Sequence, residues 1–446
     1  MFSDLPKYAE TTSNSFWSTR TPAHWAVRPG LAVLQENRRK NTGLIETQVL
    51  SLSYGQVVVK PIEKQHGLVP DSYEGYQVLE PGDIVVRPTD LQNDQTSVRV
   101  GHAKDHGIIT SAYIGLRAVG GWGSAYAYEY LTVIDSTKRI YGMGRGLRQQ
   151  LGWADLKRMA CLVPPVEEQS AIVKYLMHAN SRVDKAISAK RRLMALLREE
   201  EKAEIRNMLA ALDGPIVRAK DACLRIIDCK NRTPDYVEGD KFHVIRTSCV
   251  RAGNFSLEGS YPTSEENFAI WTQRGVPEPG DVLFTREAPA GEAALMPEGI
   301  DACLGQRMML YRPDPSKIRS EYLMRAIYDD PARKFITLAT NGSTVGHLRV
   351  GDVGAIPIRL PELTVQDQVL EGIQRVSGSA SRAVERIEQE VALLQEFRTR
   401  LVADVVTGQV DVRAIAASLP DAPEQDPELD SLLDDDLEDV LGEGGE

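Results

Sequence analysis

The sequence contains no run of 18 or more apolar residues, which is the length a helix needs to cross a bilayer. Its first ten residues, MFSDLPKYAE, do not combine a basic segment with an apolar stretch, so we expect no secretory signal there. These two absences predict a cytoplasmic protein that does not bind a membrane.

The sequence is also poor in cysteine, and its cysteines form no CxxC pair. We therefore expect free, buried thiols in a reducing compartment rather than a disulfide framework or a zinc site. The five positions are Cys161, Cys223, Cys229, Cys249 and Cys303.

Sequence motifs of catalysis are missing as well: there is no GxxxxGK[ST] phosphate loop, no HExxH helix and no GxSxG turn. The glycine-rich segment 142–146 lacks GxGxxG spacing, so we interpret it as a flexible loop. His102 and His106 stand four residues apart without an obvious third ligand, which favours a surface loop over a metal site. The sequence favours binding and positioning, with no metal and no cofactor in this chain.

Positive charge is in deficit overall, with 52 Lys and Arg against 63 Asp and Glu in 446 residues. The deficit is confined to residues 411–446, which hold 13 acidic residues and a single basic one, Arg413. Residues 1–410 therefore carry a net charge of +1. The composition of the last 36 residues predicts an acidic, disordered tail, and a neutral body is less basic than a protein that grips DNA unaided.

What the sequence does contain is an internal repeat with an offset of about 197 residues. EPGDIVVR at 80–87 recurs as EPGDVLFTR at 278–286, and VPPVEEQSAIVKYL at 163–176 aligns with LPELTVQDQVLEGI at 360–373. Glu129-Tyr130-Leu131 likewise recurs as Glu321-Tyr322-Leu323. A period this long predicts that each copy is a whole domain with a connector.

Each copy has a first part with short apolar runs bounded by turn residues, typical of strands, and a second part with a heptad pattern, typical of a long helix. In the second copy, Ile373, Ala380, Ile387, Leu394 and Leu401 recur every seven residues. Thr364 has the spacing of a helix N-cap. The predicted boundaries are a first domain at 1–163, a helix at 164–213, a second domain at 214–361, a helix at 362–410 and the tail at 411–446.

Two helices of about 45 residues would each be roughly 65–70 Å long. Each would expose an apolar stripe that its own domain cannot cover, and its twin is the natural partner. A whole domain joins the two helices, so spacing alone does not force antiparallel pairing, but an antiparallel pair would place the two globular parts at opposite ends of a rod. We predict an α+β protein with two similar globular domains, separated by two long helices that pair as an antiparallel coiled coil with pseudo-twofold symmetry. A plain structural coiled coil is the alternative.

Polar residues that could contact nucleic acid follow the predicted strands. Arg, Gln and Asn can make paired hydrogen bonds to base edges, and Lys and Arg neutralise phosphates. The candidates are Arg87, Thr89, Gln92, Asn93 and Arg99 in the first copy and Lys230, Arg232, Arg286 and Glu287 in the second.

These segments resemble the specificity subunits of type I restriction-modification systems. The resemblance covers about residues 1–413 and rests on RPTDLQNDQTSVRVG, GLRQQLGWADLKRMACLVPPVEEQSAIVKYL, EPGDVLFTREAPAGE, ACLGQRMMLYRP, GSTVGHLRVGDV and LVADVVTGQVDVR. The start of the second helix departs from the family's PPL-x-EQ pattern, because Glu362 replaces the second proline, although Gln366 is retained.

The resemblance implies two target recognition domains, each reading one half of a bipartite site in double-stranded DNA. It implies that the helices set the spacer between the halves and dock two modification (methyltransferase) subunits, which would hold the S-adenosylmethionine, and that motor-nuclease restriction subunits join the complex. This chain would then be a non-catalytic member of the complex. The resemblance adds five residues to the DNA-binding candidates: Arg307, Ser343, Thr344, His347 and Arg349.

Two other functions remain open from the sequence. The chain could be a coiled-coil scaffold that assembles partner proteins without reading DNA. It could also be a stand-alone nuclease or methyltransferase, although the missing catalytic motifs argue against that.

Overall fold

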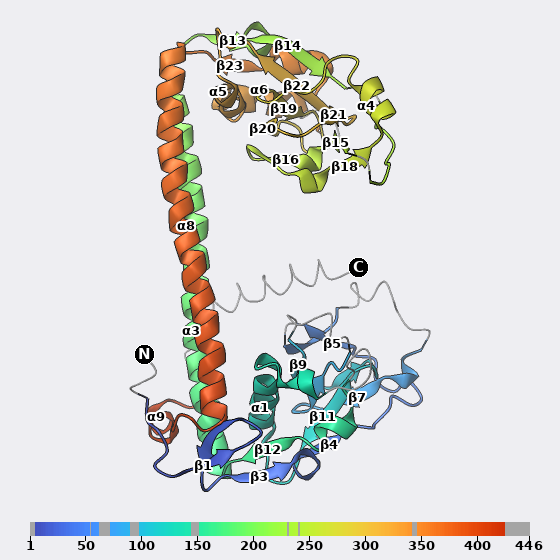
Figure 1. Ribbon diagram of the computed structural model, residues 1–446, viewed down its shortest axis with the longest axis vertical. Coiled ribbons are helices and arrows are strands. Elements are labelled where there is room, and N and C mark those ends of the chain that lie inside the picture. Colours follow the sequence, from blue (N-terminus) through green and yellow to red (C-terminus); the bar gives the residue numbers. More distant parts are fainter. Residues whose placement is uncertain are drawn as a thin grey trace. The chain divides into compact units, whose positions relative to one another are not determined.

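The computed structural model describes residues 5–53, 55–61, 72–89, 98–143, 151–229, 232–239, 241–340 and 346–423. The chain divides into two compact units, Met1–Arg192 with Ile387–Glu446, and Leu193–Arg386. Each unit contains one globular part, called here head 1 (residues 5–163) and head 2 (residues 215–361), and a share of the long helices α3 (Val166–Ala210) and α8 (Leu363–Val406) (Figure 1). No helix in the described ranges is long and apolar enough to cross a membrane.

The two heads share a four-stranded antiparallel core with the same strand order. In head 1 the order is β4 (Leu34–Glu36), β11 (Ile114–Ala118), β8 (Ile84–Val86) and β9 (Val100–Ala103). In head 2 it is β14 (Cys223–Asp228), β22 (Met308–Pro313), β19 (Val282–Thr285) and β20 (Ala293–Leu295). The internal repeat predicted from the sequence is confirmed by this common order.

Further elements of the two heads also correspond. A two-stranded ribbon leads into each long helix: β3 (Ala26–Pro29) pairs with β12 (Ala160–Val163), and β13 (Ile216–Arg218) pairs with β23 (Pro357–Arg359). The helix α1 (Ser124–Ser136) follows β11 in head 1, and α5 (Ser320–Ala326) follows the equivalent strand β22 in head 2. A short helix precedes the second strand of each ribbon: α2 (Trp153–Leu156) comes before β12 in head 1, and α7 (Val350–Ala355) comes before β23 in head 2. Head 2 also contains α6 (Asp330–Thr340).

Outside this shared core the heads differ. Head 1 extends the sheet with β5 (Leu50–Ser53) and β6 (Gln56–Val59), and adds a β7 (Gln77–Leu79) and β10 (Gly107–Ile109) pair and a hairpin of β1 (Thr11–Asn14) and β2 (Thr19–Pro22). Head 2 instead carries a second sheet of β18 (Tyr261–Thr263), β15 (Phe242–Ile245) and β21 (Ala302–Leu304), together with β16 (Val250–Arg251), β17 (Asn254–Phe255) and α4 (Glu265–Trp271).

Each long helix is anchored by apolar side chains in the core of a head. In head 1, Leu401 and Val405 of α8 pack in one cluster with Trp122, Tyr126 and Tyr130. In head 2, Val369 and Ile373 of α8 pack in one cluster with residues of β19 and β22. The ends of the helices are therefore parts of the head cores and not separate rods.

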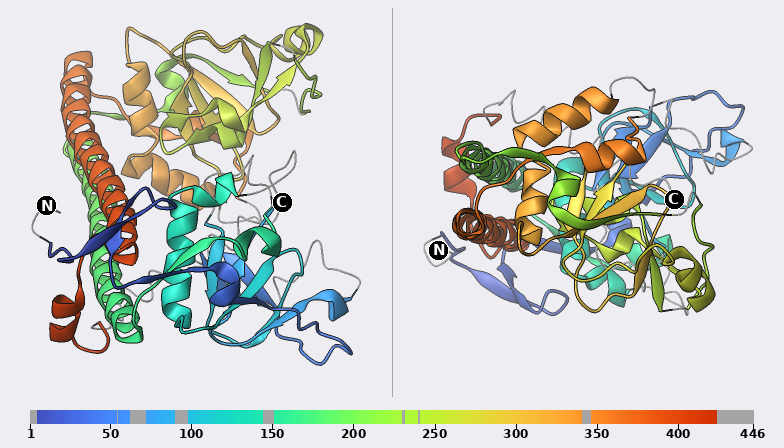
Figure 2. Two further views of the ribbon diagram at one scale, coloured as in Figure 1. Left: turned by 60° about the horizontal axis from the view of Figure 1, so that its bottom comes forward. Right: turned by 90° about the horizontal axis from the view of Figure 1, so that it is seen from above.

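The two long helices run side by side in opposite directions, as the views in Figures 1 and 2 show. In the first unit, Asp184 pairs with Arg398 and Lys190 pairs with Glu390, so residue numbers rise along one helix while they fall along the other. Arg398, which interrupts the apolar seam in the sequence, thus has an acidic partner on α3. The predicted antiparallel pair is confirmed.

Two details of the sequence prediction are wrong. Thr364 is not the N-cap of α8, because the helix begins at Leu363 and the Glu362 carbonyl accepts the hydrogen bonds from Val365 and Gln366. The disordered tail expected from residue 411 does not begin there, since α9 (Arg413–Ser418) follows with Val412 and Ala416 buried. The prediction rested on the average composition of residues 411–446, which is acidic, and therefore missed the apolar positions at its beginning.

Candidate nucleic-acid interface

A buried aspartate fixes the turn before the central strand of each head. In head 1, Asp83 accepts two hydrogen bonds from Arg117, at 2.8 and 2.9 Å, and one from the Glu80 backbone N–H. In head 2, Asp281 accepts the same three from Arg312 and the Glu278 N–H. Bidentate arginine–carboxylate pairs are rigid as well as strong. They hold β8 and β19, and hence the polar residues directly after them, in a defined position.

Behind β8 in head 1, the structure gives Arg99 a bracing role. Its side chain is completely buried, and its guanidinium donates to the Thr89 carbonyl at 2.6 Å and to the Tyr141 hydroxyl at 3.2 Å. The backbone N–H of Arg99 donates to Asp135, a carboxyl whose pKa is raised by burial. In this fold Arg99 supports the backbone beyond β8 at Thr89 and has no exposed surface with which to contact DNA, so its prediction as a direct contact is corrected.

The other candidates of head 1 are only partly described. Arg87 and Thr89 are half-buried just beyond β8, and the Arg87 N–H continues the ladder by donating to the Arg99 carbonyl. Several candidates lie outside the described residues, namely Gln92, Asn93, Lys230, Ser343 and Thr344.

In head 2 the structure brings four candidates together beyond β19. Glu287 is the centre, with Arg307 at 3.7 Å on one side and His347 at 3.6 Å on the other. Arg286 is buried, and its Nη2 donates to the Gln306 carbonyl at 3.2 Å. Arg307 and His347 are exposed and available to a ligand, whereas the contacts of Arg286 are internal.

Two further candidates of head 2 are Arg232 and Arg349, of which only Arg349 lies near this cluster in the sequence. Arg232 is exposed, and its carbonyl accepts a hydrogen bond from the Trp271 indole at 2.9 Å. Arg349 is also exposed and precedes α7, where its backbone N–H donates to Asp352. Both side chains are exposed.

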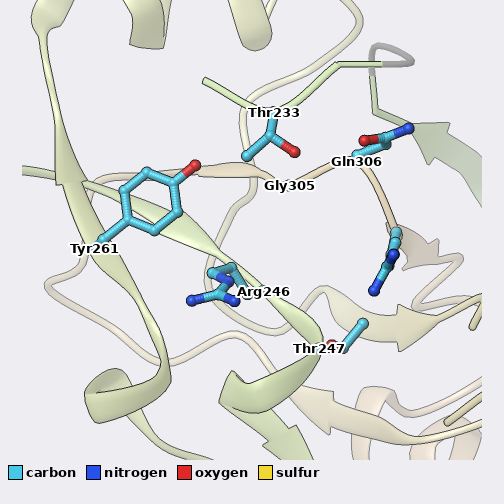
Figure 3. Close-up of a pocket in the computed structure, with 7 residues that line it drawn as sticks. Thr233, Arg246, Thr247, Tyr261, Gly305 and Gln306 are labelled. Carbon is cyan, nitrogen blue, oxygen red and sulfur yellow. The ribbon is translucent and has the colours of Figure 1, made fainter. Parts of the chain in front are cut away.

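Beside the cluster lies a pocket of about 270 Å³, called here the arginine pocket. Its lining side chains come from separate strands and turns and surround one space (Figure 3). The lining residues are Thr233, Arg246, Thr247, Tyr261, Gly305, Gln306 and Arg307. Of these, only Arg307 was among the residues chosen from the sequence.

A signal in the sequence could have found Arg246. It follows the buried strand β15 directly, in the same way that Arg87 follows β8 and Arg286 follows β19. Tyr261 and Thr233 carry no such signal, because they reach the pocket only through the pairing of β18 with β15 and the fold of the preceding segment. Long-range contacts of this kind are not visible in local patterns.

The histidine pair does not form a metal site. His102 lies 2.8 Å from the Ser124 hydroxyl, and His106 contacts the carboxylates of Glu80 and Glu46, each at 2.9 Å. No group of three or more metal-ligating side chains occurs within the described part of the chain. All five cysteines are free.

A glutamine at the start of each long helix joins that helix to its head. The Gln169 amide accepts from the Gly123 N–H at 2.7 Å and donates to the Gly121 and Pro164 carbonyls. Gln366 makes the equivalent hydrogen bonds in head 2: its amide accepts from the Arg319 N–H at 2.8 Å and donates to the Lys317 and Pro361 carbonyls. Both side chains are buried, so each head is held at a fixed angle to the beginning of one helix.

No protein-family model matches this chain, and no curated protein matches it either. Among solved structures, it is similar to a chain from "Structural basis underlying complex assembly and conformational transition of the type I R-M system", with a TM-score of 0.58 and 17% identity over 88% of this chain and 100% of that chain.

Two further solved chains are similar over comparable lengths. The HsdS subunit from Thermoanaerobacter tengcongensis gives a TM-score of 0.43 at 18% identity over 88% of this chain and 99% of that one. The type I restriction-modification S subunit from M. genitalium gives 0.33 at 12% identity over 86% and 96%. These two scores are too low to support the assignment, which rests on the first chain. In fold, this protein resembles a chain of a type I restriction-modification system, as its sequence motifs predict.

Proposed function

We propose that this chain is the DNA sequence-specificity subunit of a type I restriction-modification complex. One observation carries the proposal: two heads share a four-stranded core, and an equivalent glutamine pins each of them to the start of one of two paired helices. Recognition of a two-part site requires two such heads, one for each half. The fold similarity to a type I restriction-modification chain supports the same assignment.

In this proposal each head reads one half of a bipartite site in double-stranded DNA. The residues beyond β8 and β19, with Arg232, Arg307, His347 and Arg349 of head 2, supply the contacts that distinguish bases and hold phosphates. The segments 90–97, 230–231 and 341–345, which include five of the candidates, remain part of the proposed surface on the strength of their sequence alone.

The chemistry belongs to partners in this proposal. A methyltransferase must extrude an adenine from the stack before it can modify that base, and its subunits would hold the S-adenosylmethionine. Two such subunits would dock on the long helices, and motor-nuclease subunits would complete the restriction complex. The neutral charge of residues 1–410 fits a chain that shares the duplex with partners, since those partners can supply much of the phosphate contact.

Methylome sequencing of cells with and without this chain, in the presence of the methyltransferase subunits, tests the proposal. We expect a methylated bipartite motif that disappears when the chain is removed. A methylation pattern that does not depend on the chain would contradict the proposal. A complex that assembles around the chain but shows no preference among DNA sequences at any salt concentration would indicate the scaffold function instead.

The proposed role of the helices as a spacer has its own test. Inserting one heptad into α3 and one into α8 at facing positions, within residues 184–190 and 390–398, keeps the apolar seam in register. It lengthens the pair by about 10 Å, which corresponds to roughly three base pairs of B-DNA. We expect the non-specific spacer of the methylated site to lengthen by that amount, and an unchanged spacer would refute the spacer role.

A further inference from the structure

The arginine pocket of head 2 lies on elements that head 1 does not have. Arg246 follows β15 and Tyr261 lies in β18, two strands of the second sheet that is absent from the shared four-stranded core. Gly305, Gln306 and Arg307 form the turn that joins β21 of that second sheet to β22 of the core. Any ligand of this pocket is therefore bound by head 2 alone.

The described lining of the pocket contains two arginines and no acidic side chain. The nearest carboxylate that pairs with either arginine is that of Glu287, at 3.7 Å from Arg307 Nε, and it also contacts His347. Two guanidinium groups around one small space repel each other unless an anion lies between them. The charge of the pocket therefore calls for an anionic ligand.

The pocket is formed before any ligand binds. The Arg246 guanidinium lies over the Tyr261 ring, 5.8 Å from its centroid, and the Tyr261 hydroxyl donates to the Pro234 carbonyl at 2.6 Å. The Gly305 N–H donates to the Ile245 carbonyl at 2.8 Å, which ties the turn to the strand that carries Arg246. Preformed donors lose little entropy on binding, so an anion would find its partners already in place.

The donors match a phosphate better than a base. The guanidinium groups are joined by the hydroxyls of Thr233 and Thr247 and by the Gln306 amide, and a tetrahedral anion accepts hydrogen bonds from all sides. A base would need an open aromatic face to stack on, but Arg246 already lies over the one ring in the lining. The volume of about 270 Å³ is sufficient for a phosphate with its solvent.

We infer that the arginine pocket binds a backbone phosphate of the DNA and fixes the register of the duplex on head 2. The inference rests on the proposed function, because it presumes that head 2 binds DNA. A contact of this kind carries no sequence information itself, but it decides which base edges the neighbouring residues Arg307, His347 and Arg349 can reach.

The test measures the binding of the full-length chain, assembled with its methyltransferase subunits, to a duplex that contains the mapped site and to a scrambled duplex, across a range of salt concentrations. Replacing Arg246→Ala should weaken binding to both duplexes by the same factor and reduce the slope of log K against log salt by about 1. Arg246→Lys should retain the slope, because it keeps the charge. Arg218→Ala, which removes an exposed arginine of β13 paired with Asp221, is the matched control and should leave the slope unchanged.

The possible failures are distinguishable. If the wild-type complex does not prefer the mapped site, the proposed function fails before the pocket is tested. If Arg246→Ala leaves the affinity and the slope unchanged, the inference is overturned while the proposed function stands. This holds even if calorimetry shows that the pocket binds inorganic phosphate. A loss of preference at a single base pair without a change in slope would make Arg246 a base contact and would also overturn it.

Discussion

The two heads are alike at the buried glutamine near the start of each long helix, but they differ at the residue before it. Gln169 and Gln366 make the same three hydrogen bonds, but the residue before each is different: Glu168 in head 1 and Val365 in head 2. Glu168 is buried and accepts hydrogen bonds from the Tyr8 hydroxyl at 3.1 Å and the Trp25 indole at 2.8 Å.

The difference follows from what each head must hold. Head 1 is completed by segments outside the repeat: residues 5–25, and residues 407–418 after α8. Glu168 fastens both, because His24 lies 2.6 Å and Arg413 3.4 Å from its Oε1. Burial, together with the Glu168 carboxylate, also raises the pKa of Tyr8 well above its ordinary value. Head 2 lies between the two long helices in the chain, so it needs no such fastening.

The end of α8 shows the same adaptation. Gly408 has a φ of +74°, which ends the helix in the left-handed conformation that glycine favours. A Cβ at this position would overlap the Pro22 ring, so glycine also permits the close approach of the β1–β2 hairpin. The Gln409 amide then donates to the Arg20 carbonyl at 2.6 Å. The VTGQ segment therefore connects α8 to head 1.

The largest expected effect comes from the buried aspartates of the shared core. Asp281→Ala should destabilise the second unit by about 3 kcal/mol, because it leaves Arg312, whose side chain is only 18% exposed, without its bidentate partner. Asp83→Ala should cost less, about 2 kcal/mol, because the Arg117 side chain is 52% exposed and water can solvate it. Hydrogen exchange of the β19 and β8 amides measures each effect in its own head. Asp301→Ala, at an exposed position of head 2, is the control, and exchange in β19 that does not change in Asp281→Ala would contradict the brace.

Exchanging the residues that distinguish the helix starts is expected to act on one head only. Glu168→Val should destabilise the first unit by about 2–3 kcal/mol, because it leaves buried donors of Tyr8 and Trp25 unpaired. The reciprocal Val365→Glu lies at a half-buried position and should cost less than about 1 kcal/mol. Limited proteolysis at segments 5–25 and 407–418 reports the release of the fastened segments. Equal effects of the two variants would show that the fastening role is wrong.

The glutamines should give matched losses. Gln169→Ala and Gln366→Ala each remove the three hydrogen bonds that a buried side-chain amide makes with the backbone and should each cost about 2 kcal/mol in their own unit. Thermal unfolding monitored by hydrogen exchange at the starts of α3 and α8 provides the measurement. A large loss in one variant with none in the other would break the equivalence of the two mounts.

The smallest expected effect is a difference in pH dependence at a repeated position. Burial raises the pKa of Glu129 in α1 to about 7, whereas its counterpart Glu321 in α5 pairs with Arg325 at 3.8 Å. A raised pKa favours the protonated carboxyl in the folded state. The contribution of Glu129 to the free energy of unfolding is therefore full below about pH 4 and is lost as the pH rises to about 7. We expect the first unit to lose stability over this interval, by less than the full linkage value because solvent screens the half-buried side chain, and Glu129→Gln to abolish that loss. A free energy of unfolding that does not change with pH in either the wild-type chain or Glu129→Gln would contradict this. Glu321→Gln is the control.

The features that the sequence predicted are those carried by repetition and periodicity. The EPGD turns, the pairing of the two long helices and the retained Gln366 follow from patterns that local chemistry explains, whereas the heptad spacing alone did not force the antiparallel direction. What the sequence could not show is whether a polar side chain next to a strand points into the core or toward solvent. Arg99 and Arg307 look equivalent as residues before a strand, but the first is buried as a brace and the second is exposed beside a pocket. The pairing of β15 with β18, which creates that pocket, depends on contacts between distant segments.

The central claim is that each head reads its own half of the site, and exchanging one head tests it most directly. Residues 215–361 are replaced by the corresponding part of a relative that directs methylation at a different sequence, and the methylome of cells carrying the hybrid is mapped. The account predicts that one half of the bipartite motif changes while the other half and the spacer stay the same. A motif in which both halves change, or neither does, would contradict it.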